Sequence, residues 1–463
     1  MAHESSMNKG MKDLTIGKPF SCILGFWFPV FLGTLFQQFY NMVDTMIVGK
    51  YLGLKQLAGV GVTGSLSFLI IGFCTGICSG FAIPVAQAFG ARDEKGLRKY
   101  VTNSVWYCVV VSIVMTIATV LLCRQMLVWM NTPEEAFIYA YHYIVIVFAG
   151  IPFTVLYNMV SGIFRSLGDS KSPVVFLIIS SLLNVVLDLL FIPGMGMDVE
   201  GAALATIIAQ GVSGVASLVY LIRKFEILKM QKGDWKPEKQ CLWTLTVIGL
   251  PMGLQYSITA IGSIVLQAAV NSFGEIAVAG VAAANKVYSL LTCPLEAMGN
   301  TMATYAGQNM GAKKTERITK GLYQATLACI GLSVVMFFVV LVFGNQLSMM
   351  FINKEETEAL GYAYQYILIA AAGFPLLTFV LTVRFTIQGM GYSAFAMTAG
   401  VLEMIARCFA ALVLPEYFGF HSVCLANLCA WLAADLFLIP AFFYCRRKLE
   451  GKRFHLRLRS VAK

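Results

Sequence analysis

The sequence has 463 residues, of which 58% are hydrophobic and 13% are charged, and its mean hydropathy is +0.75. A soluble protein of this length needs more polar surface, so the composition excludes a soluble globular chain and indicates a polytopic membrane protein. The net charge of +10 is distributed over separate loops, so it does not indicate a nucleic-acid-binding surface.

Twelve apolar runs follow a polar segment of 17 residues, and each is long enough to cross a bilayer, which takes about 20 residues. The runs are longer and more uniformly apolar than the strands of a transmembrane barrel. Helices also satisfy every backbone polar group within the span, as lipid requires. The sequence therefore predicts an all-α membrane protein with twelve transmembrane helices. In chain order the runs cover 18–49, 54–84, 99–123, 135–164, 172–193, 199–222, 241–273, 276–308, 318–347, 358–390, 394–416 and 420–445.

Basic residues alternate from one set of loops to the other. Of the 34 Lys and Arg residues, 27 lie in the N-terminal segment, in the loops after runs 2, 4, 6 and 8, and in the C-terminal tail. By the positive-inside rule, both termini are predicted to be cytoplasmic in a cell membrane. The basic tail is also suited to contact anionic membrane lipids. The twelve cysteines are scattered through the runs and predict neither a disulfide framework nor a metal site.

The two halves of the chain resemble each other. The segment AQAFGARDEKGL at 86–97 aligns with GQNMGAKKTERI at 307–318, and other matches share offsets of 221–223 residues. Each half then holds six helices, which predicts two bundles related by a pseudo-twofold axis along the membrane normal. The predicted divisions are a cytoplasmic N-terminus (1–17), an N-lobe (18–222), a linker (223–240), a C-lobe (241–445) and a basic tail (446–463).

Charged side chains within the predicted spans need a partner or a function, since each costs about 2.5–3.5 kcal/mol at mid-membrane on insertion scales. Glu403 and Arg407 are one helical turn apart, which predicts a structural ion pair. Arg384 and Asp435 are expected to pair with each other or to extend toward the interface. Glu296 has no local partner, and is expected either to line a central cleft or to serve packing.

Two further acids, Asp44 and Asp188, are predicted to lie at a similar depth near the outer ends of the first and fifth helices. Asn184 shares a helical face with Asp188, and Thr206 reaches the same depth on the sixth helix. Their oxygen atoms suit a hard cation, so Asp44 and Asp188 form a candidate sodium site. Two neighbouring acids in low dielectric also favour proton uptake, so the same four residues are a candidate proton site.

The repeat predicts that this cation site is confined to the first bundle. At the repeat offsets, Asn184 aligns with Arg407, Asp188 with Ala411 and Asp44 with Leu266. The second bundle has thus lost the acids and carries a fixed cation.

These motifs resemble those of the MATE (multidrug and toxic compound extrusion) family. The resemblance rests on FQQFYNMVDTMIVGKYLG at 36–53, on the repeated AQAFGAR and GQNMGAK turns, and on the twelve-helix repeat. It implies two six-helix lobes around a cavity, and export of organic cations or other drugs in exchange for sodium ions or protons. It further implies coupling through the first lobe by Asp44, Asn184, Asp188 and Thr206, with a helix bend at Pro29.

Alternatives from other functional classes remain open at this stage. Gln37, Tyr40 and Asn41 form a polar stripe that is expected to line the substrate cleft, together with Glu296. A lipid-linked saccharide flippase of similar fold would need several bases in that cleft, and only Arg384 and Arg407 are available. An integral membrane enzyme lacks a nucleophile–base pair, and no phosphate-binding loop motif occurs. The expected protein is a monomeric transporter with no cofactor besides the coupling ion.

Overall fold

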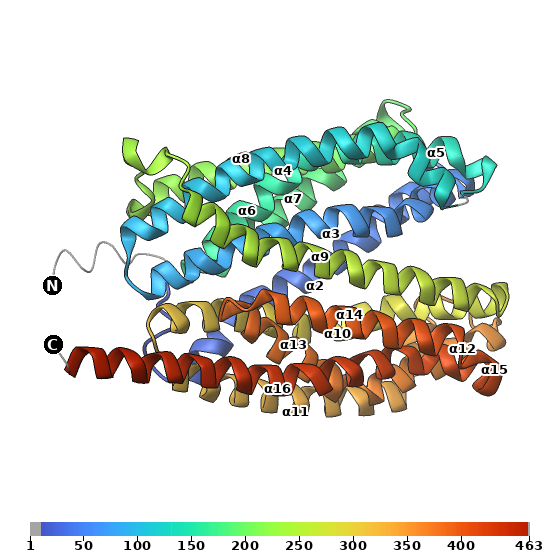
Figure 1. The fold of residues 1–463 in the computed structure, drawn as a ribbon. Helices are drawn as coiled ribbons and strands as arrows, with labels where there is room; N and C mark the ends of the chain where they lie inside the picture. Colours follow the sequence, from blue (N-terminus) through green and yellow to red (C-terminus); the bar gives the residue numbers. More distant parts are fainter. Residues whose placement is uncertain (1–10, 131, 462–463) are drawn as a thin grey trace. The chain divides into compact units, whose positions relative to one another are not determined.

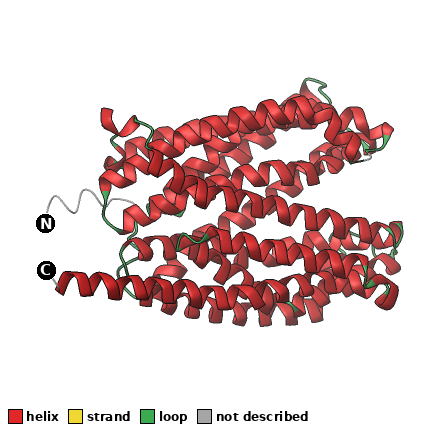
Figure 2. Cartoon of the chain, in the orientation of Figure 1, coloured by secondary structure: helices red, strands yellow, loops and turns green. Residues whose placement is uncertain are grey.

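The computed structural model describes residues 11–130 and 132–461, and within them the chain forms helices joined by short loops (Figure 2). The all-α prediction is confirmed. The first half contains α2 (Pro19–Tyr51), α3 (Leu54–Gly90), α4 (Glu94–Trp129), α5 (Glu134–Ala149), α6 (Ile151–Ser166), α7 (Lys171–Leu189), η1 (Leu190–Gly194) and α8 (Val199–Lys224). After η2 (Glu226–Leu228) and η3 (Lys232–Trp235), the second half contains α9 (Lys239–Asn271), α10 (Glu275–Gly311), α11 (Thr315–Ser348), α12 (Thr357–Ala372), α13 (Phe374–Gly389), α14 (Ser393–Leu412), α15 (Pro415–Phe418) and α16 (Phe420–Val461).

The predicted spans correspond to these helices, but two of them are broken. Ten helices of the described chain are long and apolar enough to cross a membrane, and two bent pairs bring the number to twelve. The pair α5–α6 bends by 49° at Gly150, and the pair α12–α13 bends by 52° at Gly373. A proline lies two residues after each glycine, in the first turn of the next helix, where its missing backbone N–H costs no intrahelical hydrogen bond. The last helix, α16, also continues to Val461, well into the segment expected to be a separate tail.

The internal repeat is visible in the backbone and in the packing (Figure 1). In the first half α3 packs on α5 and α6 and α7 packs on α8, while in the second α10 packs on α12 and α13 and α14 packs on α16. The turns repeat as well, since Arg92 and Lys313 both have a φ of 57°. Gly168 and Gly391 have φ angles of 81° and 89°, which favour glycine because it has no Cβ.

Contacts divide the chain into two compact units whose limits fall inside two helices. The first unit contains Phe28–Ser257, and the second contains Leu14–Trp27 together with the chain from Ile258 onward. The first part of α2 therefore packs in the second unit, and the first part of α9 packs in the first unit. The predicted lobes keep both helices whole, and that division at 222 and 241 stays a prediction.

Small residues bring α9 against α3 within the first unit. A Cβ added to Gly80 would lie 2.5 Å from the Cα of Gly249, and one added to Gly76 would lie 2.8 Å from the Cα of Gly253. Such close backbone approach is typical of helix packing in membranes, where small side chains maximise van der Waals contact.

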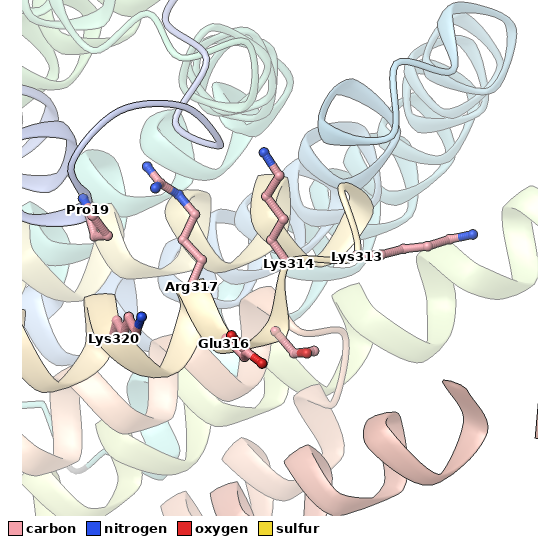
Figure 3. A pocket seen from close by; sticks show the side chains of 7 residues that line it. Pro19, Lys313, Lys314, Glu316, Arg317 and Lys320 are labelled. Atoms are coloured by element: carbon pink, nitrogen blue, oxygen red, sulfur yellow. The ribbon is translucent and has the colours of Figure 1, made fainter. Parts of the chain in front are cut away.

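The N-terminal segment before α2 is fastened to the second unit by backbone hydrogen bonds. Arg317 Nη1 donates to Gly17 O at 2.6 Å, and Lys314 Nζ donates to Thr15 O at 2.9 Å. Leu14 N donates to Gln308 Oε1 at 2.9 Å. Figure 3 shows Lys314 and Arg317 pointing in the same direction from the start of α11. They line a pocket of about 400 Å³ whose other lining residues are Pro19, Lys313, Thr315, Glu316 and Lys320.

The predicted linker is docked on α4 of the first unit. Arg98 Nε donates to Asp234 Oδ2 at 3.0 Å, and Thr102 Oγ1 donates to Asp234 O at 2.6 Å. Gln231 N also donates to Asp234 Oδ2 at 3.0 Å. These donors, the Gln231 backbone N–H first and then Arg98, hold the pKa of Asp234 below its ordinary value.

Asp234→Asn is expected to lower the melting temperature at neutral pH, because it removes the charged acceptor of Arg98. Hydrogen bonds to a charged group contribute about 1.5–3 kcal/mol. A depressed pKa stabilises the fold above the unfolded-state pKa of about 3.9, and this contribution is lost as the pH falls through the folded-state value. The melting difference between wild type and variant should therefore be constant near pH 7 and shrink below about pH 4. Asp198→Asn is the matched control, since aspartate and asparagine can both cap the start of α8. An equal fall in melting temperature in Asp198→Asn would contradict the prediction.

Candidate cation site

The candidate coupling residues lie on three helices of the first unit. Asp44 is on the second half of α2, Asn184 and Asp188 are on the last two turns of α7, and Thr206 is on the second turn of α8. Asn184 and Asp188 share one face of α7, as their spacing of four residues requires. Both are buried, with 1% and 0% of their surfaces exposed. The structure thus brings together the residues that sequence analysis placed at one depth.

Asn184 is the bridge of this cluster. In the amide orientation that gives hydrogen-bond partners to both its nitrogen and its oxygen, Nδ2 donates to Asp188 Oδ2 at 3.0 Å and to the Tyr40 hydroxyl at 2.8 Å. Its amide oxygen accepts from Thr206 N at 3.0 Å and lies 3.3 Å from Thr206 Oγ1. Tyr40, which was expected to line the substrate cleft, therefore contacts the candidate cation site.

The two acids are in direct contact. The carboxyl groups of Asp44 and Asp188 lie within hydrogen-bonding reach of each other. Two ionised carboxylates repel at this range in low dielectric, so the contact requires a proton or a cation between them. Oδ1 of each residue is also buried without a hydrogen-bond partner among the described residues. The cluster therefore has free acceptor capacity for a positively charged ligand.

Apolar side chains surround the cluster and keep its dielectric low. Ile47, Val48, Ile192 and Ala202 form a small buried core about one helical turn away. Tyr143 on α5 packs against that core, and its hydroxyl is close enough to interact with both carboxyl groups. Sequence analysis missed Tyr143, because its position depends on packing between helices. The chain after Asp188 continues as the π-helical turn η1, a feature often found at functional sites.

The other predicted site residues lie outside this cluster. Gln37 and Asn41 are exposed on α2, and Pro29 lies within the same helix, two residues after the end of the segment that packs in the second unit. Glu296 is exposed on α10 of the second unit, beside Thr292 of the same helix.

The second unit holds a buried ion cluster of a different composition. Glu403 accepts from Arg407 Nη2 at 3.0 Å and from Arg384 Nη2 at 2.6 Å. All three side chains are about 6% exposed. Arg384 therefore pairs with Glu403, whereas the sequence-based expectation had been Asp435 or the interface. Leu266 and Ala411, at the positions of Asp44 and Asp188 in the repeat, are buried apolar residues.

The donor set of the first-unit cluster fits sodium or a proton. It offers carboxylate, amide and hydroxyl oxygens, which are the ligands that hard cations prefer. The part of the chain that the structure describes contains no group of three or more His, Cys, Asp and Glu residues that could hold a metal ion. A sodium ion here would thus depend on neutral oxygens beside two carboxylates, while a proton needs only the acid pair.

Comparison with known proteins agrees with this architecture. The MatE family matches residues 29–190 and 251–412, two segments of one family separated by the predicted repeat offset. The chain is 31% identical over 389 residues to "Probable multidrug resistance protein YpnP" of Bacillus subtilis, covering 83% of this chain and 85% of that protein.

Solved structures of low sequence identity share the fold. "Crystal structure of MATE in complex with MaL6" superimposes with a TM-score of 0.88 at 22% identity, covering 96% of this chain and 99% of that one. "Outward-facing conformation of a multidrug resistance MATE family transporter of the MOP superfamily" gives a TM-score of 0.87 at 23% identity, with the same coverage. The family is one of transporters and not of enzymes. The chain is a multi-pass membrane protein and belongs to the MATE family.

Proposed function

We propose that this protein is a secondary active exporter of drugs, in particular organic cations, that exchanges them for an inward-moving cation by alternating access. The observation that carries the proposal is the contact between the half-buried Asp44 and the buried Asp188, with a buried, unpartnered oxygen on each. A buried acid pair in a membrane span is costly unless it binds a cation during the transport cycle. The relative from Bacillus subtilis is named as a multidrug resistance protein, which supports drugs as the substrate class.

The hydrogen-bonding pattern favours a proton as the coupling ion. Asn184 turns its Nδ2 toward Asp188, while its oxygen is occupied by Thr206. A proton shared by the two acids satisfies their contact by itself, whereas a sodium ion would need further neutral oxygen ligands beside the two carboxylates.

Neutralising the acid pair would change the position of α2 relative to α7. When a proton or cation is bound, both carboxyl groups are held to the same ion. When none is bound, the two carboxylates repel each other. Pro29 removes one intrahelical hydrogen bond from α2 and lets the helix bend at that level. The ion must bind one conformation better than the other, since only differential affinity shifts the equilibrium.

The direction of exchange follows from charge. The positive-inside rule places both termini on the cytoplasmic side, with the acid pair toward the outer end of α2. A proton entering from outside moves down the membrane potential, which contributes about 2.3 kcal/mol per charge per 100 mV. Exchange of one proton for one monovalent organic cation moves no net charge, so the pH gradient drives that exchange, whereas export of an uncharged drug also gains this energy.

Export by purified protein in lipid vesicles tests the proposal. A fluorescent organic cation is loaded into vesicles, and its movement is followed under a proton gradient alone, a sodium gradient alone, or neither. Movement driven by the proton gradient is the expected result, and movement driven only by sodium would identify the other coupling ion. If neither gradient moves the compound or a panel of uncharged drugs, the exporter proposal is wrong.

Lipid-linked saccharide flipping has weaker support from this structure. A diphosphate group would need free bases, but Arg384 and Arg407 are both paired with Glu403. The same vesicles, loaded with a fluorescent lipid-linked saccharide, distinguish this alternative by the transfer of label between leaflets.

A further inference from the structure

Asp435 is a buried acid to which the proposed coupling mechanism assigns no role. It lies on α16, is 4% exposed, and neither of its carboxyl oxygens has a hydrogen-bond partner among the described residues. Buried polar groups are nearly always hydrogen-bonded, and an ionised carboxylate without partners is especially costly. In this conformation Asp435 is therefore suited to carry a proton.

The charged neighbours of Asp435 come from the two helices packed most closely on α16. Arg384 on α13 and Glu403 on α14 are the described groups whose charges act on Asp435. From α12, Tyr366 accepts from Asn427 at 3.1 Å, about two turns before Asp435. The charged residues of α11 lie in its first two turns, and the one acid of α15, Glu416, is exposed.

Arg384, whose charge acts on Asp435, has an unused donor. It donates through Nη2 to Glu403 Oε2, while its Nε is buried without a partner among the described residues. Arg407 likewise donates through Nη2 to Glu403 and leaves Nε unpartnered. When Asp435 is protonated, the two guanidinium groups share the single carboxylate of Glu403. When Asp435 is ionised, this cluster holds two buried cations and two buried anions.

We propose that Asp435 is a second proton-binding group of this transporter, located in the second unit. When its O–H bond breaks, the proton passes to water and the carboxylate takes a hydrogen bond from Arg384. Arg384 then divides its donors between Asp435 and Glu403, and it returns wholly to Glu403 when Asp435 is protonated again. The exchange couples protonation to the packing of α13, α14 and α16, which run side by side (Figure 1).

This inference concerns a group distinct from the Asp44–Asp188 pair, and it stands whether or not that pair drives export. The sequence-based expectation that the coupling site is confined to the first bundle stays a prediction. The acid pair of the first unit has no counterpart at Leu266 and Ala411. Asp435 instead uses a different helix and an arginine-containing environment.

Infrared difference spectroscopy of the purified transporter in lipid bilayers tests the proposal directly. A protonated carboxyl group has a carbonyl stretch that disappears when the group ionises, so a pH titration records each buried acid. Wild type is expected to show a band that Asp435→Asn lacks, and the variant Asp44→Asn/Asp188→Asn is expected to keep it. If Asp435→Asn shows the same titrating bands as wild type, Asp435 is not a proton-binding group.

A second variant keeps the test decisive if Asp435→Asn folds poorly. Asp435→Glu retains a carboxyl group on a longer side chain, so its band is expected to persist with a shifted frequency and a shifted titration midpoint. An unchanged spectrum in Asp435→Glu would contradict the proposal. Because the spectra require no transport, failure of the exporter proposal leaves this result unaffected, and the two can fail separately.

Discussion

Asp44→Asn is expected to abolish gradient-driven export while the protein still folds and binds its substrate. The substitution keeps the shape of the side chain but removes the acid that contacts Asp188. A carrier that no longer exchanges a proton for the substrate loses about 1.4 kcal/mol of driving force per unit of pH gradient, which is about a tenfold loss of concentrating ability. Efflux of a fluorescent cation from vesicles under an imposed proton gradient measures this loss.

Two variants separate the loss of the coupling group from a general loss of charge. Asp198→Asn removes a carboxylate from the cap of α8, outside the spans, and is expected to export like wild type. Asp44→Glu retains the acid and is expected to export more slowly but to remain gradient-dependent. Full gradient-driven export by Asp44→Asn would rule out the Asp44–Asp188 pair as the coupling site.

The sequence predicted the helices well because long apolar runs leave few alternatives in lipid. Runs such as 318–347 can satisfy their backbone only as helices, and α11 covers that run with three residues more at its start. The breaks at Gly150 and Gly373 were not predicted, although Gly-x-Pro occurs at both places. Hydropathy, from which the spans were predicted, gives no signal for these bends, since the chain is equally apolar before and after each break.

The candidate cation site could be predicted only in part. Counting turns from the ends of the spans was enough to place Asp44, Asn184, Asp188 and Thr206 at one level. Rotation of each helix about its axis is set by packing against its neighbours, and hydropathy does not report it. For that reason Tyr143 was missed, the contact of Tyr40 with Asn184 was not expected, and Arg384 was expected to pair with Asp435 or to extend toward the interface, whereas it pairs with Glu403. The exchange of the first parts of α2 and α9 between compact units likewise depends on contacts distant in sequence.

Glu403→Gln is expected to be the most destabilising single substitution among the buried charges of the second unit. It leaves two buried guanidinium groups, Arg384 and Arg407, without their shared carboxylate. Removing one partner of a buried ion pair costs about 3–5 kcal/mol, because the remaining charge is left uncompensated. Thermal unfolding in detergent, followed by tryptophan fluorescence or by light scattering, measures the loss. Glu416→Gln on α15 is the matched control, since that side chain is exposed and is expected to have little effect.

Replacing the whole cluster distinguishes charge compensation from simple packing. The variant Arg384→Met/Glu403→Leu/Arg407→Met removes all three charges, so it is expected to recover much of the stability that Glu403→Gln loses. Asp435 refines this expectation, because the charge of Arg384 acts on it and it can replace Glu403 as a counter-ion once ionised. The loss caused by Glu403→Gln should then be larger in an Asp435→Asn background than in wild type, with an interaction energy of about 0.5–3 kcal/mol. Equal losses in both backgrounds would mean that Asp435 does not compensate for Glu403, and an unchanged melting temperature in Glu403→Gln would mean that the cluster is not a source of stability.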